Sequence, residues 1–107
     1  MSRKQEDADL NEHKVAVLER WQGQPTGAFS ADEFMAGRMP RRGVELCTIV
    51  ETMYSLGVMA QNGSVSFADR LERIAVNALP AALTADMWAH NYLSMVNEVQ
   101  ATTRCVQ

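Results

Sequence analysis

Three stretches of the chain repeat their hydrophobic residues at the spacing of an α-helix. In the first, Leu10, Val17 and Trp21 fall on one face. Gly23 and Pro25 follow, and both residue types stop helices. The pattern therefore predicts a helix that begins near Leu10 and ends at these two residues.

The second stretch, from about Val44 to Asn62, has the strongest pattern. Its hydrophobic residues cover more than half of the circumference of the predicted helix, which is typical of a helix buried by several neighbours. Three helices of these lengths offer it too little cover. The pattern thus indicates either part of a larger protein or one subunit of a homo-oligomer that assembles through this helix. The residues form two adjacent lines, Leu46, Ile49, Val50, Met53 and Leu56 in one, and Cys47, Tyr54 and Val58 in the other.

The third stretch begins at Ser66, a good N-cap that stands three residues before Asp69. Pro80 predicts the end of this helix. Thr84 is a second good cap, and the residues after it are expected to form either a short helix or an extended segment. The apolar face of the third helix consists of Phe67, Leu71, Ile74, Ala75 and Ala78.

Between the first two predicted helices, the segment Gly23–Gly43 contains four glycines and two prolines in 21 residues. This density of helix and strand breakers predicts a long loop, and such a loop is uncommon in a small domain unless it has a function. The expected fold class is all-α, with about three main helices and this Gly/Pro-rich loop. Residues 10–99 are expected to form a single helical domain between a flexible N-terminus at 1–9 and a tail at 100–107.

Composition and charge narrow the function classes. The chain has 107 residues and a net charge of −3, so we expect one small domain without the basic face of a nucleic-acid binder. Cys47 and Cys105 are too few for a disulfide framework. The charged N-terminus lacks the pattern of a signal peptide, and no apolar run approaches the roughly 20 residues of a membrane span. A cytoplasmic protein without a nucleic-acid or membrane partner is expected.

Glu45 and Cys47 stand together at the start of the second predicted helix. Inside a helix, residues two apart point in different directions, but at a helix entry both side chains can converge on one metal ion. The free N–H groups of the first turn would also favour the thiolate that zinc requires. The alternative interpretation is a buried Cys47 packed as a small hydrophobe, with Glu45 as a charge at a helix N-terminus. Zinc needs four ligands, and the spacing of the remaining cysteine and histidines identifies no further ones.

Two segments resemble one enzyme family. The stretches "GQPTGAFSADEFMAGRMPRRGVELCTIVETMYSL" and "FADRLERIAVNALPAALTADMWAHNY" resemble glycoside hydrolase family 127, the β-L-arabinofuranosidase family, over roughly Val15–Val99. The resemblance implies a segment of an (α/α) barrel from a protein several times longer. It also implies zinc as the cofactor, with Glu45 and Cys47 as two of its ligands. Glu33 is the implied general acid/base, with Asp32 as its competitor.

The chain departs from this family at the nucleophile. In the family, a Cys-Cys pair supplies the nucleophile and two more zinc ligands, but this sequence has no Cys-Cys. The expected function is therefore that of part of a zinc-dependent retaining glycoside hydrolase, inactive as the isolated chain. The alternative is a small stand-alone helical module for interaction or oligomerisation, without catalysis.

Three further residues are candidates for the substrate side of the site. Trp88, His90 and Tyr92 lie in "WAHNY", and aromatic rings beside a histidine suit stacking and hydrogen bonding to a sugar. They suit an apolar patch at the end of a helix equally well.

Overall fold

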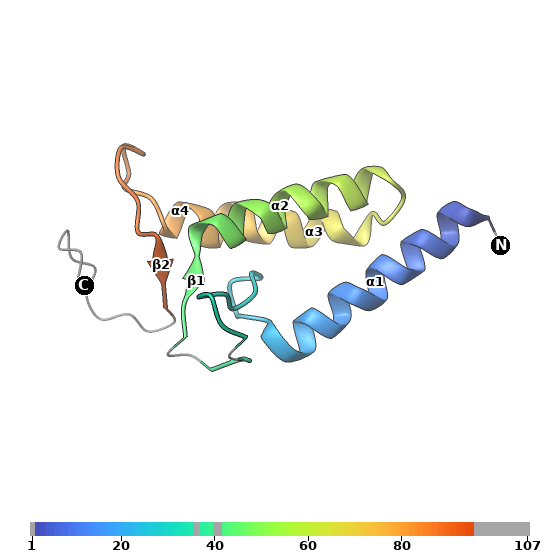
Figure 1. The fold of residues 1–107 in the computed structure, drawn as a ribbon. Coiled ribbons are helices and arrows are strands. Elements are labelled where there is room, and N and C mark those ends of the chain that lie inside the picture. Colours follow the sequence, from blue (N-terminus) through green and yellow to red (C-terminus); the bar gives the residue numbers. More distant parts are fainter. Residues whose placement is uncertain (1, 36, 40–41, 96–107) are drawn as a thin grey trace.

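The computed structural model describes residues 2–35, 37–39 and 42–95 (Figure 1). It is mostly helical and measures 54 × 30 × 19 Å along its principal axes. Two antiparallel helical rods lie side by side, α2 (Leu46–Gln61) in one and α3 (Ser66–Arg73) with its continuation in the other. The longest helix, α1 (Arg3–Gln22), runs obliquely below this pair.

The helix α1 begins earlier than the hydrophobic pattern predicts. Its N-cap is Ser2, whose hydroxyl oxygen accepts a hydrogen bond from the backbone N–H of Gln5 at 3.4 Å. The Gln5 side chain also donates to Asp9 at 2.8 Å, one helical turn further on. Local polar contacts therefore extend the helix into the stretch for which hydrophobic periodicity predicts a flexible N-terminus, because capping does not require an apolar face.

The core lies between α2 and the second rod. Ile49 and Leu56 of α2 are 2% and 1% exposed, and they pack against Phe67, Ile74 and Ala78. The two α2 residues belong to the first line of the predicted helix, so this part of the prediction is confirmed. Burying side chains of this size is the main source of stability in a small domain.

The second rod does not end where its proline predicts. After α3 the chain forms a wider π-helical turn, Ile74–Ala78, and then the short helix α4 (Leu79–Ala81). Pro80 lies at the beginning of α4, where its missing N–H is tolerated. The expected N-cap Ser66 is also wrong, because Val65 occupies the cap position and the Ser66 hydroxyl donates to Glu12 of α1 at 3.2 Å.

A small sheet, which the all-α prediction does not include, joins the segment before α2 to a segment that follows α4. The strand β1 (Val44–Glu45) pairs antiparallel with β2 (Leu93–Ser94), with Val44 opposite Ser94. Helix α2 consequently begins at Leu46, two residues later than its hydrophobic pattern predicts. The described residues after Thr84 form a turn and then this strand, which agrees with the extended alternative rather than the helical one.

The loop between α1 and β1 contains only isolated backbone bridges among its described residues. One bridge joins Gly23 to Phe29, and another joins Ala31 to Val44 of β1. Ala28 is completely buried and belongs to the core. The loop is therefore packed onto the helices instead of extending into solvent.

One face of α2 remains uncovered. Val50, Tyr54 and Val58 are 47%, 71% and 40% exposed, although the pattern predicts a helix buried on most sides. None of the helices in the described part of the chain is both long and apolar enough to cross a membrane.

Candidate functional site

The pairing of β1 with β2 brings Tyr92 to the first turn of α2. The backbone N–H of Leu46 donates to the carbonyl oxygen of Tyr92 at 2.7 Å. Glu45 and Cys47 flank Leu46, so both side chains lie next to the tyrosine. A residue distant in the sequence thereby joins the predicted acid–thiol pair.

Glu45, Cys47 and Tyr92 form a mutual cluster. The Cys47 thiol donates to Glu45 Oε2 at 3.4 Å, and its sulfur lies 3.3 Å from the Tyr92 hydroxyl. That hydroxyl in turn donates to Glu45 Oε2 at 3.4 Å. The thiol is exposed, so Cys47 is not the buried hydrophobe of the alternative interpretation. The spacing argument, convergence at a helix entry, agrees with this geometry.

The cluster changes the acidity of its tyrosine. The hydrogen bond with Cys47 is the largest cause that raises the pKa of Tyr92 to about 12, followed by desolvation and by the nearby charges of Cys47 and Glu45. A third negative charge beside a thiolate and a carboxylate is unfavourable. The phenol therefore stays protonated at neutral pH and keeps the single O–H that it donates to Glu45.

A hollow of about 490 Å³ lies beside the cluster, and we call it the loop hollow. Glu33 and Glu45 both line it, so the implied acid/base residue and the implied zinc ligand face one space. Ring and aliphatic side chains supply much of the wall, as in many small-molecule sites. The complete lining consists of Leu18, Gln22, Phe29, Ser30, Ala31, Glu33, Phe34, Met35, Glu45 and Thr48.

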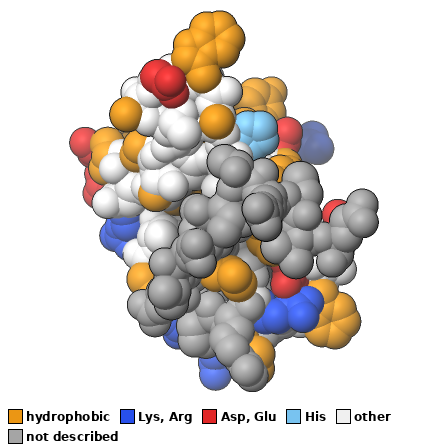
Figure 2. Space-filling model, turned by 90° about the vertical axis from the view of Figure 1, so that its left-hand side faces the viewer, with side chains coloured by type: hydrophobic (Ala, Val, Ile, Leu, Met, Phe, Trp, Pro, Cys, Tyr) orange, Lys and Arg blue, Asp and Glu red, His pale blue; other side chains and the backbone are white. Residues whose placement is uncertain are grey.

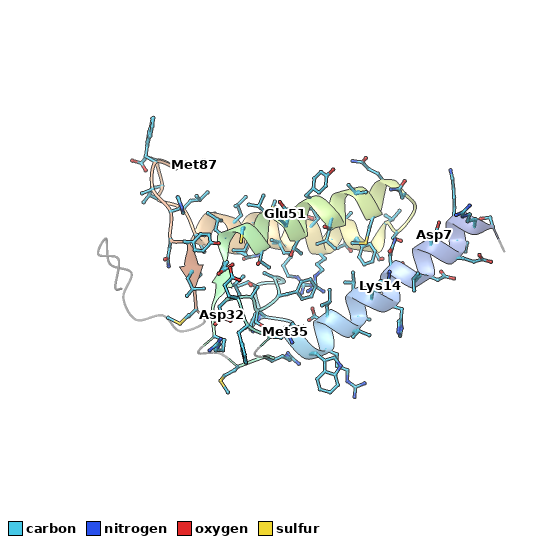
Figure 3. The ribbon with its side chains drawn as sticks, viewed as in Figure 1. Asp7, Lys14, Asp32, Met35, Glu51 and Met87 are labelled. Carbon is cyan, nitrogen blue, oxygen red and sulfur yellow. The ribbon has the colours of Figure 1, made fainter. Side chains whose placement is uncertain are left out.

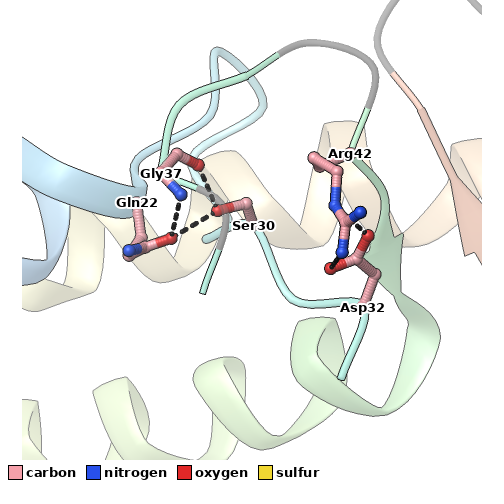
Figure 4. A network of polar contacts seen from close by, with 5 residues as sticks. All are labelled: Gln22, Ser30, Asp32, Gly37 and Arg42. Carbon is pink, nitrogen blue, oxygen red and sulfur yellow. Dashed lines mark hydrogen bonds and ion pairs between the residues drawn. The ribbon is translucent and has the colours of Figure 1, made fainter. Parts of the chain in front are cut away.

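The two adjacent loop carboxylates have different surroundings. Arg42 holds Asp32 in an ion pair, with Nε 2.7 Å from Oδ2, and its Nη2 donates a hydrogen bond of 3.1 Å to Oδ1 (Figure 4). Glu33 is exposed and has a left-handed backbone with φ of 62°, which is uncommon for a residue other than glycine. Of the two acids, Glu33 is thus the one left available to the hollow. Asp32 instead has a structural ion pair.

Sequence reasoning missed the contacts that hold the loop in place. The buried Gln22 side chain accepts from Ser30 Oγ at 2.7 Å and from the backbone N–H of Gly37 at 3.1 Å (Figure 4). The Ser30 hydroxyl also lies 2.6 Å from the carbonyl oxygen of Gly37. The sequence could have predicted such contacts only in general terms, because a packed loop without regular structure must satisfy its backbone polar groups with side chains.

The other two substrate-side candidates do not join the cluster. Trp88 is 90% exposed at the tip of a turn, and the His90 backbone pairs with Leu83. His13 lies exposed on α1. Cys105 lies outside the described residues. Only Tyr92 of the "WAHNY" segment reaches the acid–thiol pair.

The cluster contains two side chains of types that can bind zinc. A carboxylate and a thiol converge as two ligands would, and zinc accepts both donor types. Within the described residues, however, no group of three or more histidine, cysteine, aspartate or glutamate side chains could hold a metal ion. The two remaining protein ligands that a closed site would need are not supplied by that part of the chain.

Comparison with known proteins identifies no relative. No protein-family model, no curated protein and no solved structure matches the chain. The family resemblance and the barrel that it implies stay predictions.

Proposed function

We propose that this chain is part of a zinc-dependent retaining glycoside hydrolase that acts on β-L-arabinofuranosides. The observation that supports the proposal is the convergence of Glu45 and Cys47 at the entry of α2, with an oxygen–sulfur distance of 3.4 Å. The exposed Glu33 on the same hollow supports it further. In this proposal Glu45 and Cys47 hold the zinc, which keeps a bound thiol in its thiolate form.

Each residue of the site then has a role. Glu33 would donate a proton to the glycosidic oxygen of the leaving group and would later accept a proton from the water that attacks the glycosyl-enzyme bond. The Tyr92 hydroxyl contacts both ligand side chains and donates to Glu45, so that it orients them. A retaining hydrolase also needs a nucleophile on the opposite side of the sugar. The family's Cys-Cys nucleophile is absent from this sequence, so the isolated chain is expected to release no product from an aryl β-L-arabinofuranoside.

The metal part of the proposal can be tested without catalysis. Co²⁺ replaces Zn²⁺ in such sites and gives a sulfur-to-metal absorption band when a thiolate binds it. We expect the band on titration of the full chain with Co²⁺ and its loss in Cys47→Ser. Cys105→Ser is the matched control and should keep the band. A band that survives Cys47→Ser, or no band in the unaltered chain, contradicts the proposal.

The activity part has its own test. The unaltered chain is incubated with Zn²⁺ and the aryl β-L-arabinofuranoside, and release of the aryl group is followed by absorbance. Zinc-dependent release would show that the isolated chain is a complete enzyme and would overturn its assignment as an inactive part of one.

A second candidate function is a small helical interaction module that assembles with a second copy of itself. The exposed line on α2, which consists of Val50, Tyr54 and Val58, favours this function. Val50 stands four residues before Tyr54, and Val58 stands four residues after it. In an antiparallel pair of copies, Val50 of each copy would therefore contact Val58 of the other, as an isologous contact requires. Glu51 is the only charged residue of α2. With the exposed Trp88 removed by Trp88→Ala, sedimentation equilibrium should show a dimer that a further Tyr54→Glu dissociates; a monomeric Trp88→Ala chain contradicts this function.

A further inference from the structure

A turn at one end of the molecule is held in a fixed shape by its own polar groups. We call residues 84–89 the Trp88 loop. The backbone N–H of Thr84 donates to the carbonyl oxygen of Ala89 at 2.9 Å, and the N–H of Ala89 donates to the Thr84 hydroxyl at 3.1 Å. Asp86 accepts from the Thr84 hydroxyl at 2.5 Å and from the N–H of Trp88 at 3.2 Å. The loop is thus ordered before it meets any partner.

This ordered loop presents two large hydrophobic side chains to solvent. Trp88 is 90% exposed and Met87 is 75% exposed, and Met87 has a left-handed backbone with φ of 61°. Figure 3 shows Met87 at the tip of the loop, and Figure 2 shows hydrophobic side chains projecting from that end next to an acidic one. Exposed tryptophans on a rigid support are typical anchors of protein interfaces, because little conformational entropy is lost on binding.

The loop also carries a negative charge. The hydrogen bond from the Thr84 hydroxyl is the largest cause that holds the pKa of Asp86 below its usual value. Asp86 is therefore ionised at neutral pH. A matching surface would combine room for an indole ring with cationic groups at its rim.

The opposite end of the molecule has such a surface. A hollow of about 690 Å³, the α1–α2 hollow, lies between the first half of α1 and the last turn of α2. Leu10, which is 50% exposed, and Met59 supply apolar walls, while Lys4 and Lys14 supply two cations. Neither lysine belongs to an ion pair among the described residues. The other lining residues are Asp7, Ala8, Asn11, Gln61, Asn62, Gly63 and Ser64.

The loop and this hollow of one molecule cannot meet. The loop is anchored beside the first turn of α2, where Leu46 bonds to Tyr92, while the hollow adjoins the last turn at Gln61. The 16 residues of α2 separate these points by roughly 24 Å at about 1.5 Å per residue. Figure 3 shows the same separation, with Met87 at one end and Asp7 and Lys14 at the other. Any contact between the two must be intermolecular.

We propose that copies of this chain associate head to tail, with the Trp88 loop of one copy seated in the α1–α2 hollow of the next. The indole of Trp88 packs against Leu10 and Met59, and Asp86 pairs with Lys14, which stands one helical turn beyond Leu10. The indole N–H finds acceptors in the polar rim of the hollow. Such a contact joins two different surfaces, so it leaves one free loop and one free hollow at the ends of every assembly.

Complementation between two variants tests this contact. Both carry Tyr54→Glu, so that the exposed line of α2 does not contribute. One also carries Trp88→Ala, which removes the anchor, and the other carries Leu10→Glu, which places a negative charge in the hollow. Each should sediment as the 11.9 kDa chain. Mixed, they retain one intact loop and one intact hollow between them, so a 1:1 heterodimer is expected and nothing larger.

The controls separate this contact from other modes of association. Tyr54→Glu alone should still form concentration-dependent assemblies, and Trp21→Ala, which removes another exposed tryptophan, should not alter them. Added salt should dissociate them because an ion pair contributes. A monomeric Tyr54→Glu chain, assembly of the Trp88→Ala variant on its own, or a mixture that stays monomeric overturns the proposal. None of these results bears on Co²⁺ binding at Cys47, so the proposed hydrolase function is tested separately.

Discussion

At the scale of single residues, Tyr92 reports on the whole cluster. The hydrogen bond with Cys47 is the largest cause of its pKa of about 12, whereas the pKa of a tyrosine in the unfolded chain is about 10. Because the folded pKa is raised, the protonated phenol stabilises the fold fully below about pH 10. This stabilisation is lost as the pH rises toward 12. We expect Cys47→Ala to lower the pKa of Tyr92 toward its unfolded value.

Carbon-13-labelled tyrosine gives the measurement. The ring resonance of Tyr92 is followed by NMR during an alkaline titration of the unaltered chain and of Cys47→Ala. Cys105→Ala serves as the thiol control and should leave the titration unchanged. An identical Tyr92 curve in the Cys47→Ala variant would mean that the two side chains do not contact each other in solution.

The sequence predicts one part of this cluster from residues alone. Glu45 and Cys47 stand two apart after Gly43, and their convergence follows from the helix entry between them. Tyr92 lies 45 residues beyond Cys47, and only the β1–β2 pairing brings it there. Two-residue strands carry too little pattern to be recognised in a sequence. The tyrosine could therefore be named as a candidate, but not placed.

At the scale of elements, two glycines respond in opposite ways to the same change. A Cβ at Gly43 would lie 2.2 Å from Leu93 Cδ1, so Gly43→Ala must displace the Leu93 side chain of β2. A Cβ at Gly57 of α2 meets only Leu71 Cδ2 of α3 at 3.8 Å, which is an ordinary van der Waals contact. We expect Gly43→Ala to lower the free energy of unfolding by about 1–3 kcal/mol and Gly57→Ala to raise it by about 0.5–1 kcal/mol.

Urea unfolding followed by circular dichroism measures both values. Gly43→Ala should also bring the pKa of Tyr92 closer to its unfolded value, because the tyrosine shares a segment with Leu93. Gly57→Ala should leave that pKa unchanged. Equal stabilities for the two variants would show that β2 does not pack against Gly43.

Arg70 is the contact that ties three elements together. Its guanidinium donates to the carbonyl oxygen of Gly27 at 3.0 and 2.7 Å and forms an ion pair with Glu19 of α1. It also lies 4.4 Å from the centre of the Phe29 ring. Because the Gly27 carbonyl would lose its charged partners, we expect Arg70→Ala to cost about 1.5–3 kcal/mol of stability.

Thermal and urea unfolding check this cost. Arg20→Ala is the matched control, because Arg20 stacks on its neighbour Trp21 at 5.2 Å and lies exposed on α1. Its effect should stay within about 0.5 kcal/mol. Equal losses in the two variants would indicate a general effect of charge rather than the docking of the loop and α1.

Element boundaries show why hydrophobic pattern alone misplaces helix ends. The buried positions of α2 and of the second rod follow their predicted periodicity. The helix ends do not follow the predicted periodicity, because they depend on single polar contacts and on local widening of the helical turn. Ser66 binds Glu12 instead of capping α3, and a π-helical turn lets the rod continue through Pro80. A pattern of apolar residues carries no information on either feature.

At the scale of the whole molecule, the core is smaller than the apolar surface offered to it. The hydrophobic face of α1, which predicted that helix, remains largely open, with Leu10 at 50% and Trp21 at 59% exposed. Val15 packs against the core from this helix. Periodicity thus predicts that a segment is helical, but it does not state which partner covers its face. The surplus of apolar surface that was inferred from the sequence is present. Only the structure shows how this surface is distributed over α1, α2 and the Trp88 loop.

This distribution predicts unequal stability along the chain. The first half of α1 is tied to the other elements mainly by the Glu12–Ser66 hydrogen bond, and Gln22 is the buried residue of the helix. An isolated helical segment as short as this first half, about 12 residues, is marginal in water, so the amides of Arg3–Lys14 should open locally. We expect them to exchange with deuterium at least about tenfold faster than those of Ile49–Leu56, which lie in the core. Hydrogen exchange at low chain concentration, followed by mass spectrometry, measures both segments in one experiment.

At high concentration the head-to-tail contact should slow exchange near Leu10, and Trp88→Ala should remove that slowing. Uniform protection of α1 and α2 in dilute solution would contradict the prediction, because it would require contacts along α1 that its exposed face does not make.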